Sequence, residues 1–435
     1  MFVTGLFALL VGLGVIPVVL LSAVGVPAWA AFAGWLLLCA VLLGADVALA
    51  ANTRALTVTR RVPNRARHGE PVSVSVAVVN HGRRTLRGLL RDAWQPTAGA
   101  PTARQRIVVP PGERRRVETP LVPRRRGELL SDFVIIRARG PLALGGRQTR
   151  HDVTGALRVL PAFRSRKHLP SRLARLRELD GNTSIQVRGQ GTEFDSLREY
   201  VRGDDIRSID WRATARAGTT MLRTWRPERD RHVVILIDTG RTAAARVGDG
   251  TRLDASLEAA LLLGALANRA GDHVHLLLHD RVARARVTGV DGAALLPSMT
   301  DAMAPVHARL VDTDWPAAFA AIRSLTTRPS LVVVLTAQDA VESARGFLGA
   351  FPTSSRSTTV LVGSVTDEAI GTLAQRRDSR EDVYLAAAAE RSLRDAEVVA
   401  DAIRRAGGEA VAADPEALPP RIADRYLELK AAGLL

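Results

Sequence analysis

The sequence is poor in cysteine and lysine and, over its first 53 residues, in charge. Its 435 residues include one cysteine, Cys39, which excludes an intrachain disulfide and a metal site built from several cysteines. Only Lys167 and Lys430 among its 60 basic residues are lysines. We interpret the preference for arginine over lysine as a bias of overall composition rather than as a functional requirement. The net charge of +16 is therefore weak evidence for nucleic-acid binding.

The nearly uncharged start of the chain predicts a membrane anchor. Phe2 to Ser22 and Ala28 to Ala50 are apolar stretches with the length that about 30 Å of hydrocarbon requires, and residues 25–27 break them apart. A cleaved signal peptide is not expected, because the basic n-region is missing and the apolar segment is too long. We therefore predict a transmembrane helical hairpin over residues 1–51. A helical hairpin buried in a soluble core is the alternative.

The charge that follows the hairpin predicts its orientation. Residues 51–180 hold 28 Lys and Arg against 9 Asp and Glu, a net charge of +19. Basic residues beside a span mark the cytoplasmic side, and anionic headgroups there attract them. The arginines that closely follow the second span are Arg54, Arg60, Arg61, Arg65 and Arg67. We expect a cell-membrane protein whose soluble domains face the cytoplasm.

Three further regions follow from the hydrophobic patterning. Residues 52–161 alternate apolar and polar side chains in short runs such as PVSVSVAVVN, which predicts a small antiparallel β-sandwich. Residues 162–231 form a connector with one basic helix and one charged element. Residues 232–435 alternate continuous apolar strands with helices, which predicts a Rossmann-like α/β domain. Such domains bind ligands beyond the carboxyl ends of their strands.

The charged element, EFDSLREYVRGDDIRSIDWRATAR, starts at Glu193. Phe194, Leu197 and Val201 have helical spacing, so we expect two helical turns that end near Gly203. One of the next two aspartates is expected to cap a second turn. Arginines and carboxylates alternate closely enough for ion pairs, which lower carboxylate pKa values and disfavour acid catalysis.

We interpret this element as a rigid docking piece, with an ordinary ion-paired loop as the alternative. Its ion pairs are expected to hold it against the α/β domain, with Phe194, Tyr200, Ile209 and Trp211 buried beneath. The residues that we expect to form the docking element are Glu193, Phe194, Leu197, Arg198, Tyr200, Gly203, Asp204, Asp205, Arg207, Asp210, Trp211 and Arg216.

The stretch from Gly191 to Asp238 closely resembles the signature of the bacterial family called domain of unknown function 58. The flanking segments LVPRRRGELL, RGPLALGGR and RVLP are also similar to that family, and so is the order of the four regions. One departure is Gly140, where the family usually has Asp. The family has no established activity.

The resemblance implies a von Willebrand factor A-like C-terminal domain. Genes of the family often neighbour those of MoxR-type AAA+ ATPases and of transglutaminase-like membrane proteins. The implied function is a non-enzymatic, membrane-tethered scaffold or adaptor that binds a MoxR-type ATPase in envelope assembly or maturation. A transglutaminase-like membrane protein is a second implied partner.

Von Willebrand A domains commonly bind Mg²⁺ through Asp-x-Ser-x-Ser, a later Thr and a later Asp. Here Asp238, Thr242 and Thr313 keep ligand oxygens, whereas Gly240 and Ala337 stand where two further ligands belong. We expect a degenerate site without a cofactor, in which Asp238 bonds to the following loop. Bound Mg²⁺ is the alternative.

The sequence leaves two other functions open. The basic residues 51–180 could bind nucleic acid or anionic lipid, although no nucleic-acid partner is expected from the arginine bias. Scattered carboxylates could serve a hydrolase, but no nucleophile and base lie close together in the sequence. His273, His275 and His279 alternate along a predicted strand, where we expect packed or surface residues rather than metal ligands.

Overall fold

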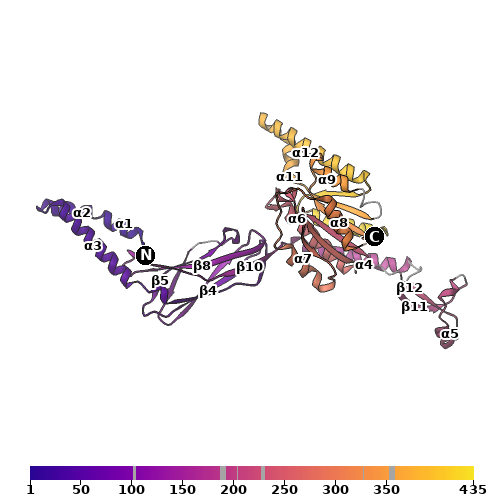
Figure 1. Ribbon diagram of the computed structural model, residues 1–435, viewed down its shortest axis with the longest axis horizontal. Coiled ribbons are helices and arrows are strands. Elements are labelled where there is room, and N and C mark those ends of the chain that lie inside the picture. Colours follow the sequence, from indigo (N-terminus) through magenta and orange to yellow (C-terminus); the bar gives the residue numbers. More distant parts are fainter. Residues whose placement is uncertain (101–103, 187–192, 203, 227–230, 327, 352–357) are drawn as a thin grey trace. The chain divides into compact units, whose positions relative to one another are not determined.

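The computed structural model describes residues 1–435 except 101–103, 187–192, 203, 227–230, 327 and 352–357 (Figure 1). The described chain divides into two compact units, Met1–Leu160 and Pro161–Leu435.

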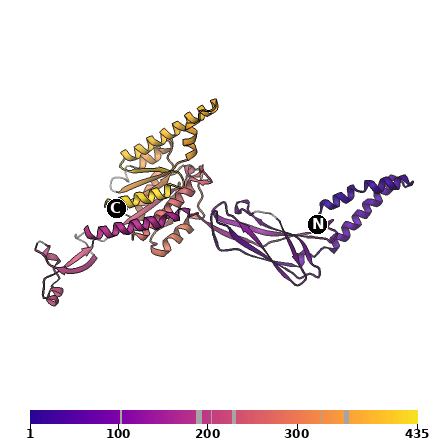
Figure 2. The same ribbon diagram turned by 180° about the vertical axis from the view of Figure 1, so that it is seen from behind.

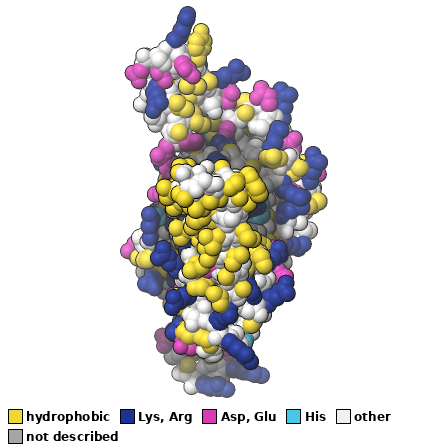
Figure 3. Space-filling view, turned by 90° about the vertical axis from the view of Figure 1, so that its left-hand side faces the viewer, with side chains coloured by type: hydrophobic (Ala, Val, Ile, Leu, Met, Phe, Trp, Pro, Cys, Tyr) yellow, Lys and Arg dark blue, Asp and Glu magenta, His cyan; other side chains and the backbone are white. Residues whose placement is uncertain are grey.

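The first unit begins with a hairpin of apolar helices, α1 (Gly5–Gly12), α2 (Val15–Ala23) and α3 (Ala28–Leu49). Two segments, Gly5–Ala23 and Ala28–Ala55, are long and apolar enough to cross a membrane, and only 6% and 17% of an apolar 18-residue stretch in each is buried. Hydrophobic side chains therefore gather on this end of the molecule (Figure 3). The two predicted N-terminal helices are confirmed at this level of length and composition.

The rest of the first unit consists of two sheets around a shared core. A three-stranded sheet has the order β2-β4-β7, and a seven-stranded sheet is built around the long strand β8. Val76 and Val78 of β4 belong to one buried cluster with Leu90 and Ile136 of the other sheet. The strands are β1 (Phe2–Val3), β2 (Leu56–Arg61), β3 (Arg65–Arg67), β4 (Val72–Asn80), β5 (Leu86–Trp94), β6 (Gln105–Val109), β7 (Arg114–Leu121), β8 (Gly127–Arg139), β9 (Gly145–His151) and β10 (Gly155–Leu160).

Asp46, the lone charge of the hairpin, joins helix α3 to the larger sheet. Its Oδ1 accepts a hydrogen bond from the Leu142 amide at 2.7 Å, and its Oδ2 accepts from the amides of Leu144 and Gly145, both at 2.9 Å. The carboxylate is fully buried. A Cβ on Gly140 would lie 2.2 Å from Asp46 Oδ1, so a glycine at this position makes room for the carboxylate.

The other end of the hairpin is joined to the same loop. Phe2 and Val3 form strand β1, which pairs with Gly145 and Gly146 of β9. The Thr4 hydroxyl donates to the Ala143 carbonyl at 2.7 Å. Both ends of the hairpin thus enter the sheet domain through residues 140–146.

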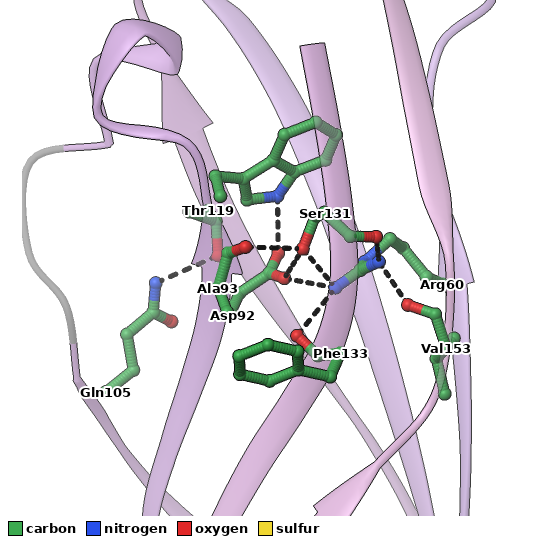
Figure 4. A network of polar contacts seen from close by, with 9 residues as sticks. Arg60, Asp92, Ala93, Gln105, Thr119, Ser131, Phe133 and Val153 are labelled. Carbon is green, nitrogen blue, oxygen red and sulfur yellow. Dashed lines mark hydrogen bonds and ion pairs between the residues drawn. The ribbon is translucent and has the colours of Figure 1, made fainter.

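A buried ion pair connects the two sheets (Figure 4). Arg60 of β2 donates to Asp92 Oδ1 of β5 at 2.5 Å, and the two side chains are 0% and 2% exposed. Arg60 also donates to Ser131 Oγ at 2.7 Å and to its carbonyl at 2.8 Å, while the Trp94 indole donates to Asp92 Oδ2 at 2.8 Å. These bonds supply donors for the carboxylate and acceptors for the guanidinium, as burial of both charges requires.

The second unit contains a six-stranded sheet with the order β17-β16-β13-β18-β19-β20, parallel except for β17 (Figures 1 and 2). Helices α4, α6, α7 and α13 share one buried cluster with the sheet, and α8, α9 and α12 share another. The sheet is therefore buried on both faces, which is why its strands are continuously apolar.

Strands and helices alternate along most of this unit, as the apolar runs of residues 232–435 predict. The strands are β11 (Glu193–Glu199), β12 (Met221–Arg226), β13 (His232–Asp238), β14 (Arg246–Val247), β15 (Gly250–Thr251), β16 (His273–His279), β17 (Ala283–Val287), β18 (Leu331–Thr336), β19 (Thr359–Val365) and β20 (Glu409–Ala413). The helices are α4 (Leu169–Gln186), α5 (Trp211–Ala217), α6 (Arg252–Arg269), α7 (Leu295–Met303), α8 (Trp315–Leu325), α9 (Val341–Ala350), α11 (Glu368–Gln375), α12 (Arg380–Arg405) and α13 (Leu418–Ala431).

Replacement of the buried arginine is expected to destabilise the sheet domain. Arg60→Ala leaves the Asp92 carboxylate buried without its cation, which typically costs about 3–5 kcal/mol. Hydrogen exchange of the β4 amides in the full-length protein measures this loss, with the exposed neighbour substitution Arg61→Ala as control. Equal protection of β4 in the two variants would show that the pair does not stabilise the domain.

Candidate functional site

Two features of the second unit are candidates for function: the carboxyl edge of the sheet and the signature element. Asp238 ends β13 and Thr336 ends the adjacent parallel strand β18. The parallel register brings both residues to the same edge, where doubly covered sheets bind their ligands.

Asp238 is 2% exposed and accepts four hydrogen bonds. Its Oδ1 accepts from the Gly240 amide at 2.8 Å and from the Thr313 hydroxyl at 2.5 Å. Its Oδ2 accepts from the hydroxyls of Thr336 at 2.7 Å and Thr242 at 3.1 Å. Asp238, Thr242 and Thr313 therefore lie together, and Asp238 bonds to the following loop as the sequence predicts.

The residues around Asp238 do not fit a Mg²⁺ site. Each carboxylate oxygen accepts two hydrogen bonds, so the hydroxyls of Thr242 and Thr313 act here as donors to Asp238. A Cβ on Gly240 would lie 2.4 Å from Thr313 Oγ1, so the position leaves no room for a ligating serine. Ala337 is buried and has no ligand atom, and Asp339 is ion-paired with Arg252.

A polar cavity of about 220 Å³ opens beside Asp238. At its rim Arg241 is ion-paired with Asp312 at 2.9 Å. Gln338 forms part of the wall and donates from Nε2 to Thr336 Oγ1 at 3.0 Å. The lining residues are Asp238, Arg241, Thr242, Val311, Asp312, Thr313, Trp315, Gln338, Glu342, Ser343 and Gly346. The cavity can accept a polar side chain or a small polar molecule.

Asp280, which follows the neighbouring strand β16, is a second buried carboxylate of this edge. It accepts hydrogen bonds from Arg284 Nε at 2.7 Å and from the Arg281 amide at 2.6 Å. Burial raises the pKa of Asp280, but these hydrogen bonds outweigh burial and hold the pKa below its ordinary value. Asp280 therefore stays ionised and is unsuited to general acid catalysis.

The signature element is an arm of two strands and a short helix, and the predicted helix over residues 193–201 is wrong. Residues 193–199 form strand β11, which pairs antiparallel with β12, for example Arg198 with Leu222. Gly203 and the side chains of Glu193 and Phe194 lie outside the described residues. Hydrogen bonding with β12 determines the conformation of this segment, although its apolar residues have helical spacing.

Aspartates shape the tip of the arm. Asp205 caps a short 3₁₀ turn, Ile206–Ser208, by accepting from the Arg207 amide at 3.0 Å, as the sequence predicts. Asp210 caps α5 by accepting from the amides of Arg212 and Ala213 at 2.9 and 3.0 Å.

Two ion pairs lie within the arm itself. Arg198 donates to Asp204 at 2.6 Å, and Arg223 donates to Asp210 at 2.7 Å. Hydrogen bonds from the Ala213 amide and from Arg223 hold the pKa of Asp210 below its ordinary value. These two pairs stabilise the arm's own turns rather than a contact with the α/β domain. That other ion pairs hold the element against that domain stays a prediction.

The expected burial of the arm's apolar residues is also corrected. Trp211 is 71% exposed, Ile206 67% and Val201 62%, whereas Tyr200 and Ile209 are half-buried. Leu197 is exposed as well, and Leu222 of β12 is buried. Large apolar side chains at the tip of a hydrogen-bonded arm are typical of a protein-binding surface.

Mg²⁺ is expected to leave the thermal stability of the protein unchanged. The donor set of Asp238 favours a hydrogen-bonded carboxylate over a coordinated cation. Thermal unfolding of the full-length protein in detergent, with MgCl₂ against choline chloride at equal ionic strength, tests this. A rise of the midpoint that is specific to Mg²⁺ and is lost in Asp238→Asn would contradict it.

The second unit is expected to lose stability on mild acidification. Burial lowers the pKa of His275 and of His279 below 6.5 in the folded protein. The unfolded chain therefore binds protons first, so the unfolding free energy is highest above pH 6.5 and falls as the pH drops below it, by at most about 1.4 kcal/mol per pH unit for each histidine. Hydrogen exchange of the β16 amides at several pH values measures the slope, and His275→Gln should reduce it.

No curated protein matches the chain, whereas solved structures do. One is the complex of Zinc 2-glycoprotein and Prolactin inducible protein from human seminal plasma, with 13% identity over 25% of this chain and 98% of that chain and a TM-score of 0.20. Another is alpha-2-macroglobulin from Escherichia coli, with 11% identity over 26% of this chain and 17% of that chain and a TM-score of 0.21. A CARDB domain from Pyrococcus furiosus has 14% identity over 24% of this chain and 94% of that chain, with a TM-score of 0.18.

Likenesses at these TM-scores assign neither fold nor function. The family comparison is more informative, because residues 196–396, which include most of the arm and the edge with Asp238, match the model of one family. That match supports the family described as Protein of unknown function DUF58 for this part of the chain.

Proposed function

We propose that the protein is a non-enzymatic scaffold, tethered to the membrane by its N-terminal hairpin, whose arm binds a partner protein. The observation that carries this proposal is the exposure of Trp211, Ile206 and Val201 at the tip of the arm. Apolar side chains of this size are usually buried, and aromatic residues dominate the binding energy of protein interfaces.

The arm is suited to binding because its turns are fixed before a partner arrives. Asp204 and Asp210 each join a backbone turn to an arginine of the arm. Such cross-links limit the conformations that the tip loses on binding, which reduces the entropy cost of association. The tip also carries exposed arginines, which favour a partner with an acidic rim. They are Arg202, Arg207, Arg212 and Arg216.

The family resemblance suggests the partner and the class of the C-terminal domain. We propose a MoxR-type AAA+ ATPase as the partner of the arm, and a transglutaminase-like membrane protein as a further member of the assembly. We also propose a von Willebrand factor A-like identity for the α/β domain and a β-sandwich for the domain that follows the hairpin. The parallel order of β16, β13, β18, β19 and β20 supports the first of these assignments.

Two arguments support a non-enzymatic protein in the cytoplasm. The buried carboxylates Asp238 and Asp280 are each surrounded by hydrogen-bond donors, so they serve as structural acceptors rather than as proton donors. The excess of arginine after α3 supports a cytoplasmic location of the soluble domains.

Loss of the exposed indole is expected to weaken partner capture. Trp211→Ala removes the largest apolar side chain of the tip, and truncation of such an anchor typically costs about 2 kcal/mol or more, roughly thirtyfold in affinity. The measurement is recovery of an AAA+ ATPase with the full-length protein after crosslinking in native membranes. Tyr384→Ala is the matched control, because this aromatic residue of α12 is 72% exposed in the same unit.

Equal recovery of the ATPase with both variants would show that the arm is not its binding surface. No recovery with the unmodified protein would show that the ATPase is not the partner. Circular dichroism of both variants checks that the loss does not reflect unfolding.

A further inference from the structure

Two arginines of the sheet domain cap the end of helix α3. Arg84 Nη1 donates to the Ala48 carbonyl at 2.6 Å, and Arg147 Nε donates to the Val47 carbonyl at 3.0 Å. The last carbonyls of a helix lack intrahelical donors and carry partial negative charge, so guanidinium groups stabilise this end.

A third arginine lies at the other end of the hairpin. The Arg137 guanidinium is 5.3 Å from the centre of the Phe2 ring, and its Nε donates to Gln148 Oε1 at 2.6 Å. Arg84, Arg137 and Arg147, here called the collar arginines, thus contact both segments where the hairpin enters the sheet domain.

Each collar arginine keeps donors for a further ligand. A guanidinium has five N–H groups, and the contacts above use one from each side chain. The planar fork of an arginine matches the oxygens of a phosphate, which it can bind through two parallel hydrogen bonds.

The nearby acids do not neutralise the collar. Asp46 is buried and satisfied by three backbone amides. Glu113, in a turn that contacts Asn80, is ion-paired with Arg115 at 2.6 Å. The exposed Arg54, Arg83 and Arg139 follow the hairpin or adjoin the collar in the chain and add positive charge.

The depth of the collar follows from the length of α3. Its 22 residues span about 33 Å at 1.5 Å per residue, close to the thickness of a hydrocarbon core. With the hairpin in a bilayer, the carbonyls of Val47 and Ala48 lie where the hydrocarbon ends and the phosphates begin. The collar is therefore continuous with the apolar surface of the hairpin.

We propose that the collar arginines bind the phosphate groups of anionic phospholipids in the leaflet that the hairpin enters. This inference rests on the membrane tether of the proposed function, but not on the arm or its partner. The bound headgroups fix the sheet domain at the membrane surface.

The test compares lipid selectivity of the full-length protein in nanodiscs that contain phosphatidylcholine with or without phosphatidylglycerol. Native mass spectrometry measures which lipid stays bound. Removal of two collar charges in Arg84→Gln/Arg147→Gln is expected to lower the preference for phosphatidylglycerol by about fivefold for each arginine. Arg124→Gln/Arg125→Gln, an equal charge change in the turn between β7 and β8, is expected to keep the preference.

Three outcomes would overturn the proposal: an equal loss in both double variants, no loss in either, or displacement of bound lipid by inorganic phosphate at constant ionic strength. The last outcome would assign the site to free phosphate. Because Arg84→Gln/Arg147→Gln also removes helix caps, Arg84→Lys/Arg147→Lys is measured beside it and is expected to keep the part of the preference that positive charge alone supplies. Carbonate extraction separates failure of the tether from failure of the collar, since a tethered protein stays with the membrane whatever lipid it prefers.

Discussion

The burial of one carboxylate, Asp46, is the constraint on which the first unit depends. An ionised carboxylate can be buried only where donors surround it, and three amides of residues 142–145 provide them. The loop must therefore adopt the shape that aims those amides at one point, which requires a glycine at position 140 and the left-handed backbone of Ala143. This interaction joins helix α3 to the loop, and the pairing of β1 with β9 joins the other end of the hairpin to the same loop.

The same use of carboxylates recurs along the chain. Between the two sheets, Asp92 accepts hydrogen bonds from the guanidinium of Arg60 and the indole of Trp94. In the second unit, Asp272 accepts hydrogen bonds from the phenol of Tyr426 and the ammonium of Lys430. Asp238 accepts hydrogen bonds from three hydroxyls and one amide at the edge of the six-stranded sheet. In each case the carboxylate accepts a hydrogen bond from a segment that is distant in the sequence. These acids therefore hold segments of the fold together and have no evident catalytic role in the described structure.

The sequence predicts the elements well where burial alone decides them. Continuous apolar runs give β13, β16 and β18, and helical spacing gives α6 and α13. The sequence-based prediction is wrong where a distant segment determines the structure: Glu193–Glu199 has helical spacing but forms a strand because it pairs with β12. It is also wrong for Trp211, which is exposed although its hydrophobicity predicts burial. The position of Asp238 at a strand end was predictable from the apolar run before it, and its proximity to Thr242 and Thr313 follows what the family resemblance implies. The contact of Asp46 with residues 142–145 has no local signal in the sequence.

Strand β1 has a consequence for how the protein is made. Phe2 and Val3 are synthesised before the hairpin, whereas their partners, Gly145 and Gly146, are synthesised only after the hairpin and most of the sheet domain. The hairpin is thus available to the insertion machinery while Phe2 and Val3 are still unpaired. Completion of the sheet edge by β1 then comes late in folding, and it locks the inserted hairpin to a domain that formed after it.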